Sequence, residues 1–341
     1  MKLAMLGAGA WGTALAISLS RDHQVTLWTR DSALAQKIRD SRTNARYLPG
    51  YSIPANVKCE SDLAGSIATA DIIIAVVPTS SLRDVTKQIT RAGSRAPLVL
   101  ACKGFEAGSG KLPYEVCSET LSPDAAIGVL SGPSFAQEVA KGLPAALTLA
   151  AFNGEFAGHA ARELNSPRLR VYSGTDVIGV ALGGALKNVM AIAAGISDGM
   201  GLGFNARAAL ITRGLAEISR LGQQLGGRTE TFMGLTGLGD LVLTTTGDLS
   251  RNRQVGLQLA QGEKLSTILE RLGHIAEGVY SAREAAARAT ALKVDMPITQ
   301  AVCDVLEERA SAREALERLL SREPKPEGST GQGTSTGAGP C

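Results

Sequence analysis

The chain has 341 residues, which is enough for two domains that each bury a core. Its 35 Lys and Arg residues nearly balance 32 Asp and Glu residues, and only 4% of the residues are aromatic. This composition excludes charge-driven binding to nucleic acids or membranes and offers no base-stacking surface, so we expect neither partner. The five cysteines are scattered without a CxxC pair, which predicts a reducing, cytoplasmic setting and no structural disulfide or metal site.

The first half of the chain alternates short apolar runs with helical patterns. This alternation is typical of an α/β domain with a doubly wound, mostly parallel, Rossmann-like sheet. The run 72–77 is apolar on both faces, as a central parallel strand should be. The strands predicted from these runs are 2–6, 25–28, 71–77, 98–101, 126–130, 146–150 and 168–172.

A glycine-rich turn, GAGAWG, separates the first strand from a helix predicted at 10–19. Gly7 allows a tight turn, Gly9 lets the backbone approach a pyrophosphate, and Gly12 lets the helix pack close to the strand. The free N–H groups and the positive dipole end of this helix would face the phosphates. With a strand before it and a helix after it, the turn predicts a dinucleotide site rather than a merely tight bend.

Arg30 and Asp31 follow the second strand, where a Rossmann sheet meets the adenosine ribose, about 20 residues after the glycine turn. An arginine at this place favours a 2′-phosphate, so Arg30 favours NADPH. Asp31 can bind a free ribose hydroxyl, which leaves NADH possible; it can also be an ordinary helix cap.

Two further strand ends carry polar residues, and ligands of open parallel sheets bind beyond the carboxyl ends of the strands. Lys103 follows the strand at 98–101 and would place an ammonium in the crevice. Gly132 and Ser134 follow the next strand and offer donors to a small anionic or hydroxylated substrate. Ser134 is also a natural helix N-cap, and Lys103 alone could be an exposed loop lysine.

From residue 176 onward the pattern is helical. We therefore predict a dinucleotide-binding domain at 1–173, a helical substrate domain at 174–322 and a Gly/Ser/Thr-rich tail at 323–341 that is expected to be disordered. Ser-Ala-Arg-Glu at 281–284 and at 311–314 predicts two helix starts with capping boxes. The predicted helices are 176–197, 205–221, 251–261, 266–272, 281–291 and 298–309.

The helix at 176–197 is almost entirely apolar, but Lys187 and Asn188 interrupt it. A charge at mid-span is costly in lipid, which favours a buried helix over a membrane span. Desolvation lowers the pKa of a buried lysine and makes its amine a workable acid or base. Gly183 and Gly184 are expected to leave open space beside Lys187, and Asp240 can approach and hold it.

Ser250, Arg251 and Asn252 begin another predicted helix. Cations oppose the dipole at a helix N-terminus, so their presence suggests that an anion binds there. Backbone donors, a guanidinium and an amide suit a phosphate. A solvated first turn is the alternative interpretation.

Taken together, the ordered motifs of the chain closely resemble those of the bacterial NAD(P)-dependent glycerol-3-phosphate dehydrogenases, over nearly the whole length except the tail. The motifs are GAGAWGTALA (7–16), NARYLPG (44–50), CKG (102–104), GPSFA (132–136), ALKN (185–188), GLGDLVLT (237–244), SRNRQVG (250–256) and AEGV (276–279).

This resemblance implies reversible reduction of dihydroxyacetone phosphate to sn-glycerol 3-phosphate for glycerophospholipid synthesis, and a homodimer. It assigns Lys187 as the proton acceptor. The implied substrate positions are Lys103, Gly132, Ser134, Lys187, Asp240, Ser250, Arg251 and Asn252. The implied cofactor positions, besides the glycine turn, are Trp11, Arg30, Lys103, Ala136, Arg251, Glu277 and Ile275, the last often valine in the family.

Two other function classes remain open. One is a related lysine-dependent dehydrogenase acting on a hydroxy acid or on 6-phosphogluconate. The other is a non-catalytic dinucleotide-binding protein, which needs the glycine turn but has no use for Lys187, Lys103 and Asp240 together.

Overall fold

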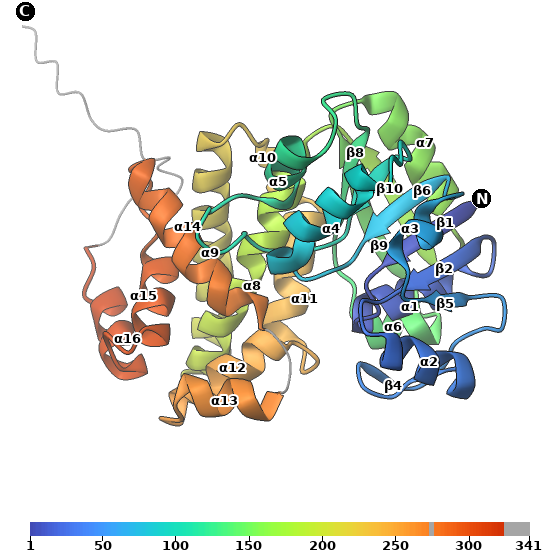
Figure 1. Ribbon diagram of the computed structural model, residues 1–341. Helices are drawn as coiled ribbons and strands as arrows, with labels where there is room; N and C mark the ends of the chain where they lie inside the picture. The colour runs from blue at the N-terminus through green and yellow to red at the C-terminus, as the bar shows by residue number, and fades with distance from the viewer. Residues whose placement is uncertain (273–275, 324–341) are drawn as a thin grey trace, which may run out of the picture.

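An eight-stranded sheet fills the first half of the chain, in the order β10-β9-β8-β7-β6-β1-β2-β5 (Figure 1). The computed structural model describes residues 1–272 and 276–323. All neighbouring strands pair in parallel except β8 and β9, so the expected mostly parallel sheet is confirmed. The strands of this sheet are β1 (Lys2–Leu6), β2 (Gln24–Trp28), β5 (Lys58–Glu60), β6 (Ile72–Ala75), β7 (Leu98–Leu100), β8 (Ile127–Ser131), β9 (Ala145–Ala151) and β10 (Leu169–Gly174).

The strand order reverses between β1 and β6, since the chain first adds β2 beside β1 and then crosses to β6 on the other side. Such a switch point opens a crevice at the carboxyl ends of the strands. Seven helices accompany the described sheet in this half, as the pattern of the sequence predicts. They are α1 (Ala10–Leu19), α2 (Ser32–Ser41), α3 (Leu63–Ile67), α4 (Thr79–Arg91), α5 (Pro113–Thr120), α6 (Ala136–Lys141) and α7 (Gly154–Leu164).

Three short strands escaped the sequence prediction. β3 (Thr43–Asn44) and β4 (Leu48–Ser52) form a separate two-stranded sheet, and β5 is the edge strand beside β2. β4 contains Pro49 and Gly50, which normally argue against a strand, and it is mostly exposed. Strands this short show no clear alternation of apolar and polar residues by which the sequence could identify them.

The second half of the chain is helical and surrounds α8, which Figure 1 shows near its middle. Among the described residues α8 is the one helix long and apolar enough to cross a membrane, and 89% of its apolar window is buried inside the protein. The helices are α8 (Val177–Gly199), α9 (Gly203–Gln224), α10 (Thr229–Met233), the π-helical turn η1 (Leu235–Gly239), α11 (Asp240–Thr246), α12 (Arg251–Ala260), α13 (Leu265–Leu272), α14 (Glu277–Ala291), α15 (Pro297–Leu306) and α16 (Ala312–Leu320).

One of the two predicted capping boxes is confirmed. Ser311 caps α16, and Glu314 returns a bond to its backbone. The box at Ser281 is wrong, because α14 begins at Glu277 and Ser281 lies inside it. Sheet elements end at Gly174 and helices begin at Val177; the division into domains at residue 173 stays a prediction. Of the predicted tail, residues 324–341 lie outside the described residues.

Candidate active site

The glycine turn lies at the carboxyl end of β1, and its three glycines have three different reasons to be there. Gly7 has a φ of +125°, and a Cβ on it would lie 2.7 Å from the carbonyl oxygen of Val76. A Cβ on Gly12 would lie 1.9 Å from the carbonyl oxygen of Gly7, so α1 could not come this close with any larger residue. Nothing lies within 4 Å of a Cβ placed on Gly9. That open space, and a first turn of α1 without a side-chain cap, fit a pyrophosphate.

A pocket of about 590 Å³ opens in front of this turn and receives side chains from both halves of the chain. Most of the predicted site residues meet in it. Those that line it are Gly7, Gly9, Trp11, Arg30, Lys103, Ser134, Lys187, Arg251, Asn252 and Glu277. Asn188 and Tyr47 also line it; no role was predicted for them from the sequence, although both lie inside the quoted motifs.

Six predicted residues do not line this pocket. Ile275 falls outside the described residues. Gly12 packs α1 against the turn, and Ala136 is the first residue of α6. The other three do not line it: Gly132 accepts hydrogen bonds from Lys103 and Ser134, Asp240 accepts them from Lys103 and Lys187, and Ser250 caps α12 directly before Arg251.

Asp240 joins two lysines that come from opposite halves of the chain. Its Oδ1 accepts a hydrogen bond from Lys187 Nζ at 2.7 Å, and its Oδ2 accepts one from Lys103 Nζ at 2.6 Å. Asp240 is fully buried, and the side chains of Lys187 and Lys103 are only 12% and 14% exposed. Lys187 also donates to Thr244 Oγ1 at 3.4 Å. The expectation that Asp240 approaches and holds Lys187 is therefore confirmed.

Burial changes the proton affinities of this cluster. The pKa of Lys187 is lowered to about 8, mainly by desolvation and also by the nearby Lys103, against the opposite effect of Asp240 and Glu277. Desolvation likewise raises the pKa of Glu277 to about 7, against the pull of Arg251, Lys103 and Lys187. An amine with a pKa this close to neutrality can both give and take a proton under ordinary conditions.

Close helix packing places the N-terminus of α12 near Lys187. A Cβ on Gly256 would lie 2.1 Å from the carbonyl oxygen of Ile192, and one on Gly195 would lie 2.0 Å from that of Arg253. The backbones of α8 and α12 therefore touch where the helices cross. Ser250 caps α12 as expected, accepting a hydrogen bond from the Arg253 N–H at 3.3 Å.

Two side chains fix the orientation of this helix start. Asn252 Oδ1 accepts a hydrogen bond from the Gly278 N–H at 3.1 Å, which ties α12 to α14. Arg253 donates to Asp198, near the end of α8, at 2.8 Å. Arg251 has neither contact and lines the pocket.

At the end of β2, both carboxylate oxygens of Asp31 have partners within the protein. Its Oδ1 accepts a hydrogen bond from the Leu34 N–H at 3.0 Å and so caps α2. Its Oδ2 lies 3.7 Å from Arg46. Arg30 is exposed and lines the pocket. The helix-cap interpretation of Asp31 is the one that the structure bears out.

Two local expectations about the site are wrong. Ser134 is not an N-cap, because α6 is preceded by Phe135, and the Ser134 hydroxyl donates to the Gly132 carbonyl at 3.0 Å. Gly183 and Gly184 do not leave open space. A Cβ on Gly183 would lie 2.6 Å from the Thr236 carbonyl oxygen, and one on Gly184 would lie 2.7 Å from Ser131 Oγ. Neighbouring chain segments fill the room that these glycines provide.

Comparison with known proteins identifies the family to which the chain is similar. Family models described as the N-terminus and the C-terminus of NAD-dependent glycerol-3-phosphate dehydrogenase match residues 2–157 and 176–317. The chain is 56% identical to the glycerol-3-phosphate dehydrogenase [NAD(P)+] of Nitrosospira multiformis, covering 96% of this chain and 99% of that protein. It is 53% identical to the protein of the same name from Dechloromonas aromatica, with 96% and 99% covered.

Among solved structures, the glycerol-3-phosphate dehydrogenase of Coxiella burnetii is similar, with a TM-score of 0.90 and 40% identity over 94% of this chain and 99% of that one. The cofactor of such proteins is a nicotinamide dinucleotide, and the glycine turn described above fits one. Fold, site and sequence thus agree that the chain belongs to the NAD-dependent glycerol-3-phosphate dehydrogenase family.

Proposed function

We propose that Lys187 is the general acid/base of the reaction that family membership assigns to this chain. That reaction is the reversible NAD(P)H-dependent reduction of dihydroxyacetone phosphate to sn-glycerol 3-phosphate, for glycerophospholipid synthesis. The observation that carries the proposal is the buried pair of lysines on Asp240, with Lys187 Nζ lining the pocket beside the glycine turn.

The glycine turn at Gly7 and Gly9 would hold the nicotinamide dinucleotide, which when bound would supply the hydride for the ketone carbon of the substrate. The protonated Lys187 Nζ donates its proton to the ketone oxygen as negative charge develops there, and in the reverse direction the neutral amine takes the hydroxyl proton. Asp240 holds both ammonium groups in place and balances part of their charge. Lys103 adds a second positive charge that stabilises the developing alkoxide.

The substrate phosphate would bind at the start of α12. Arg251 offers a guanidinium, Asn252 an amide, and the first turn its unpaired N–H groups. Gly132 and Ser134 approach from β8, and Lys103 Nζ donates to the Gly132 carbonyl at 3.3 Å. This division places the phosphate on the helical half and the reacting carbon near the two lysines.

NADPH is the cofactor that the ribose end of the pocket favours. Asp31 does not line the pocket, and its carboxylate caps α2 and lies beside Arg46. Arg30 and Arg46 both lie next to it and offer positive charge to a 2′-phosphate. NADH remains able to bind through the shared pyrophosphate site.

We expect Arg30→Ala to raise the KM for NADPH about 10- to 100-fold, the cost of losing a charged hydrogen bond, and to leave the KM for NADH nearly unchanged. Arg95→Ala, which removes an exposed arginine away from the pocket, is the control. Equal effects on the two cofactors would contradict a role for Arg30 at the 2′-phosphate.

The test of the function is a steady-state assay that follows the absorbance of the reduced nicotinamide. Purified chain is given dihydroxyacetone phosphate with NADPH or NADH, and in parallel 6-phosphogluconate and hydroxy acids with the oxidised cofactors. Turnover of dihydroxyacetone phosphate, faster with NADPH, supports the proposal. Turnover of another substrate alone, or cofactor binding without any turnover, would overturn it in favour of the two alternative classes.

We also propose a cytoplasmic homodimer. The cysteines Cys59, Cys102, Cys117 and Cys303 are all buried free thiols, which suits a reducing compartment.

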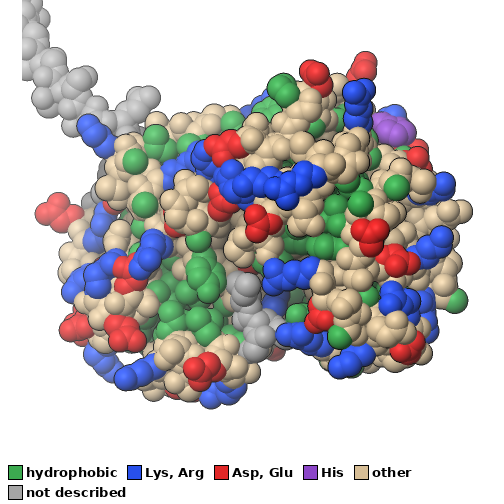
Figure 2. Space-filling model, in the orientation of Figure 1, with side chains coloured by type: hydrophobic (Ala, Val, Ile, Leu, Met, Phe, Trp, Pro, Cys, Tyr) green, Lys and Arg blue, Asp and Glu red, His purple; other side chains and the backbone are tan. Residues whose placement is uncertain are grey.

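Hydrophobic side chains gather on the surface around α8 and α15 (Figure 2). Phe204 on α9 is 81% exposed and Leu320 on α16 is 75% exposed, as on a surface that a partner covers. Sedimentation velocity measures the mass; a monomer at micromolar concentration would refute the dimer.

A further inference from the structure

Lys103 is followed by a loop, residues 104–112, that connects β7 to α5 and lies against α14 of the helical half. Ser281, Glu284 and Arg288 project from α14 at spacings of three and four residues, so they share one face of the helix. We call these three side chains the α14 clamp. None of them lines the pocket that holds Lys187.

Each member of the clamp contacts the backbone of the loop. The Phe105 N–H donates to Ser281 Oγ at 3.4 Å, and the Gly108 N–H donates to Glu284 Oε1 at 2.8 Å. Arg288 Nη1 donates to the Gly110 carbonyl at 3.0 Å.

Arg288 also reaches the helix that follows the loop. Its two terminal nitrogens each lie 2.7 Å from a different carboxylate oxygen of Glu115, on α5. A two-point pair of this kind fixes orientation as well as distance. A Cβ on Gly104, whose φ is +118°, would lie 2.9 Å from Ser281 Oγ, so the loop and α14 are in close contact at the residue after Lys103.

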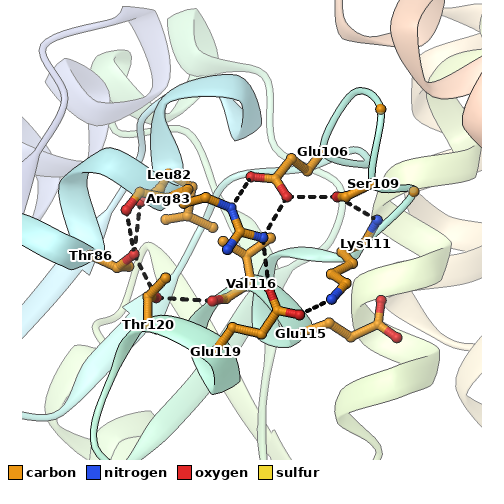
Figure 3. A network of polar contacts seen from close by, with 12 residues as sticks. Leu82, Arg83, Thr86, Glu106, Ser109, Lys111, Glu115, Val116, Glu119 and Thr120 are labelled. Atoms are coloured by element: carbon orange, nitrogen blue, oxygen red, sulfur yellow. Dashed lines mark hydrogen bonds and ion pairs between the residues drawn. The ribbon is translucent and has the colours of Figure 1, made fainter.

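The other side of the loop is held by the sheet half (Figure 3). Arg83 on α4 lies between Glu106 and Glu119, donating to Glu106 at 2.9 and 2.7 Å and to Glu119 at 2.8 Å. Lys111 pairs with the same Glu119. The Thr79 hydroxyl donates to the carbonyl of Lys103 itself at 3.2 Å. The loop is thus fixed from both halves of the chain.

We propose that the α14 clamp, with Arg288 as its main member, is a positioning device for Lys103: it sets where the Lys103 ammonium meets Asp240 beside Lys187. The inference rests on the proposed role of the two lysines. It extends that role to residues that touch neither substrate nor cofactor.

Loosening the clamp should have a signature in the pH profile. Lys187 faces Asp240 on α11, Glu277 on α14 and Lys103 on the loop, and of these Lys103 is the one that lowers its pKa. If Lys103 moves away, the pKa of Lys187 rises, and the alkaline limb of the reduction rate moves to higher pH. A merely destabilising change would lower the amount of active protein without moving that limb.

The experiment compares four variants of the full chain. Arg288→Gln breaks the clamp, and Glu284→Gln is a milder change in case the first variant folds poorly. The double variant Glu115→Arg/Arg288→Glu reverses the ion pair. Arg283→Gln is the matched control, because Arg283 lies on another face of α14 and pairs with Glu307 at 2.7 Å. Readouts are kcat, its pH profile, and hydrogen exchange of the Phe105 and Gly108 amides.

For Arg288→Gln we expect kcat to fall about 10- to 100-fold, as for a misplaced catalytic group, with an alkaline limb at higher pH and faster exchange of both amides. Glu284→Gln keeps an oxygen that can accept from the Gly108 N–H but loses its charge, so it should do the same to a lesser degree. The reversed pair keeps the ion pair but loses the bonds to the Gly110 carbonyl and the Leu112 N–H, so it should recover exchange protection and kcat only in part, and Arg283→Gln should match wild type.

An unchanged pH limb, or persisting amide protection in both Arg288→Gln and Glu284→Gln, would overturn the proposal. Failure of the proposed function is a separate result, since it would show as a wild-type chain that does not reduce dihydroxyacetone phosphate. The exchange measurement then still tests whether the clamp holds the loop.

Discussion

Lys187 lies in the middle of an apolar helix, and its charge is tolerable there because a carboxylate accepts its hydrogen bond at 2.7 Å. An unpaired ammonium at such a position would be costly. On the proposed mechanism, removing the amine removes the proton donor but leaves the glycine turn in place. A substitution of Lys187 is therefore expected to affect turnover without affecting cofactor binding.

For Lys187→Ala we expect kcat to drop about 10²- to 10⁴-fold, the usual contribution of a positioned acid or base, with nearly unchanged NADPH binding. Stopped-flow single turnovers and fluorescence titration of NADPH measure the two quantities. Lys264→Ala, which removes an exposed lysine, serves as the control. A variant that keeps near-normal kcat would remove Lys187 from proton transfer.

The pKa of Lys187, lowered to about 8 mainly by desolvation, sets the direction of the pH dependence. In the proposed mechanism reduction needs the protonated amine, so its kcat should be constant below about pH 8 and fall above it. Oxidation of glycerol 3-phosphate needs the neutral amine and should rise through the same pH. Profiles measured in both directions with one buffer series check this, and limbs of the same sign would be incompatible with a single acid/base group.

At the scale of elements, the site depends on how closely α8 and α12 cross. Gly195 and Gly256 bring the two backbones together, and the start of α12 is carried toward Lys187 as a result. The helix patterns could be predicted from the sequence, but this contact could not, because a glycine inside a helix does not reveal which segment approaches it. The same reason explains the wrong expectation for Gly183 and Gly184.

Gly256→Ala places a methyl group 2.1 Å from the Ile192 carbonyl oxygen, so the helices must separate. We expect unfolding free energy to fall by about 1–3 kcal/mol, as in other overpacked cores, and the KM for dihydroxyacetone phosphate to rise. Gly158→Ala on α7 is the matched control, since its nearest neighbour would be Arg162 at an ordinary 3.5 Å. Urea denaturation reads the stabilities. Equal values for the two variants would contradict a tight crossing.

The start of α15 is held by a buried acid. Glu217 on α9 is 1% exposed and accepts hydrogen bonds from the Ile298 and Thr299 N–H groups at 2.6 and 3.1 Å. Desolvation nevertheless raises its pKa from 4.5 to about 7. The folded chain therefore binds this proton more tightly than the unfolded chain.

The proton bound to Glu217 therefore stabilises the folded state fully below about pH 4.5, and this stabilisation is lost as pH rises through about 7. Glu217→Gln cannot titrate. As pH rises between those values, we expect the free energy of unfolding of this variant to increase by up to about 3 kcal/mol relative to wild type. Chemical denaturation at several pH values measures this difference. A difference between wild type and variant that does not change with pH would contradict this account.

At the scale of the whole molecule, single elements and site residues could be predicted from the sequence more fully than the contacts between them. Strand ends located Arg30, Lys103 and Gly132, and the apolar helix located Lys187, because each signal is local. The prediction for Ser281 was wrong, because a glutamate three residues after a serine is also the pattern of a helix start. In the structure Ser281 lies inside α14, and its hydroxyl accepts a hydrogen bond from the Phe105 N–H. The reversed direction of β9 and the short strands β3 to β5 also depend on tertiary pairing that no local pattern records.

One carboxylate, Asp240, serves as the common counter-ion of ammonium groups delivered by two separate regions of the polypeptide. A fragment ending near residue 173 would keep the phosphate-binding turn yet leave Lys103 without its acidic neighbour. We therefore expect such a fragment to lack turnover, because the two ammonium groups meet only through a residue that it does not contain.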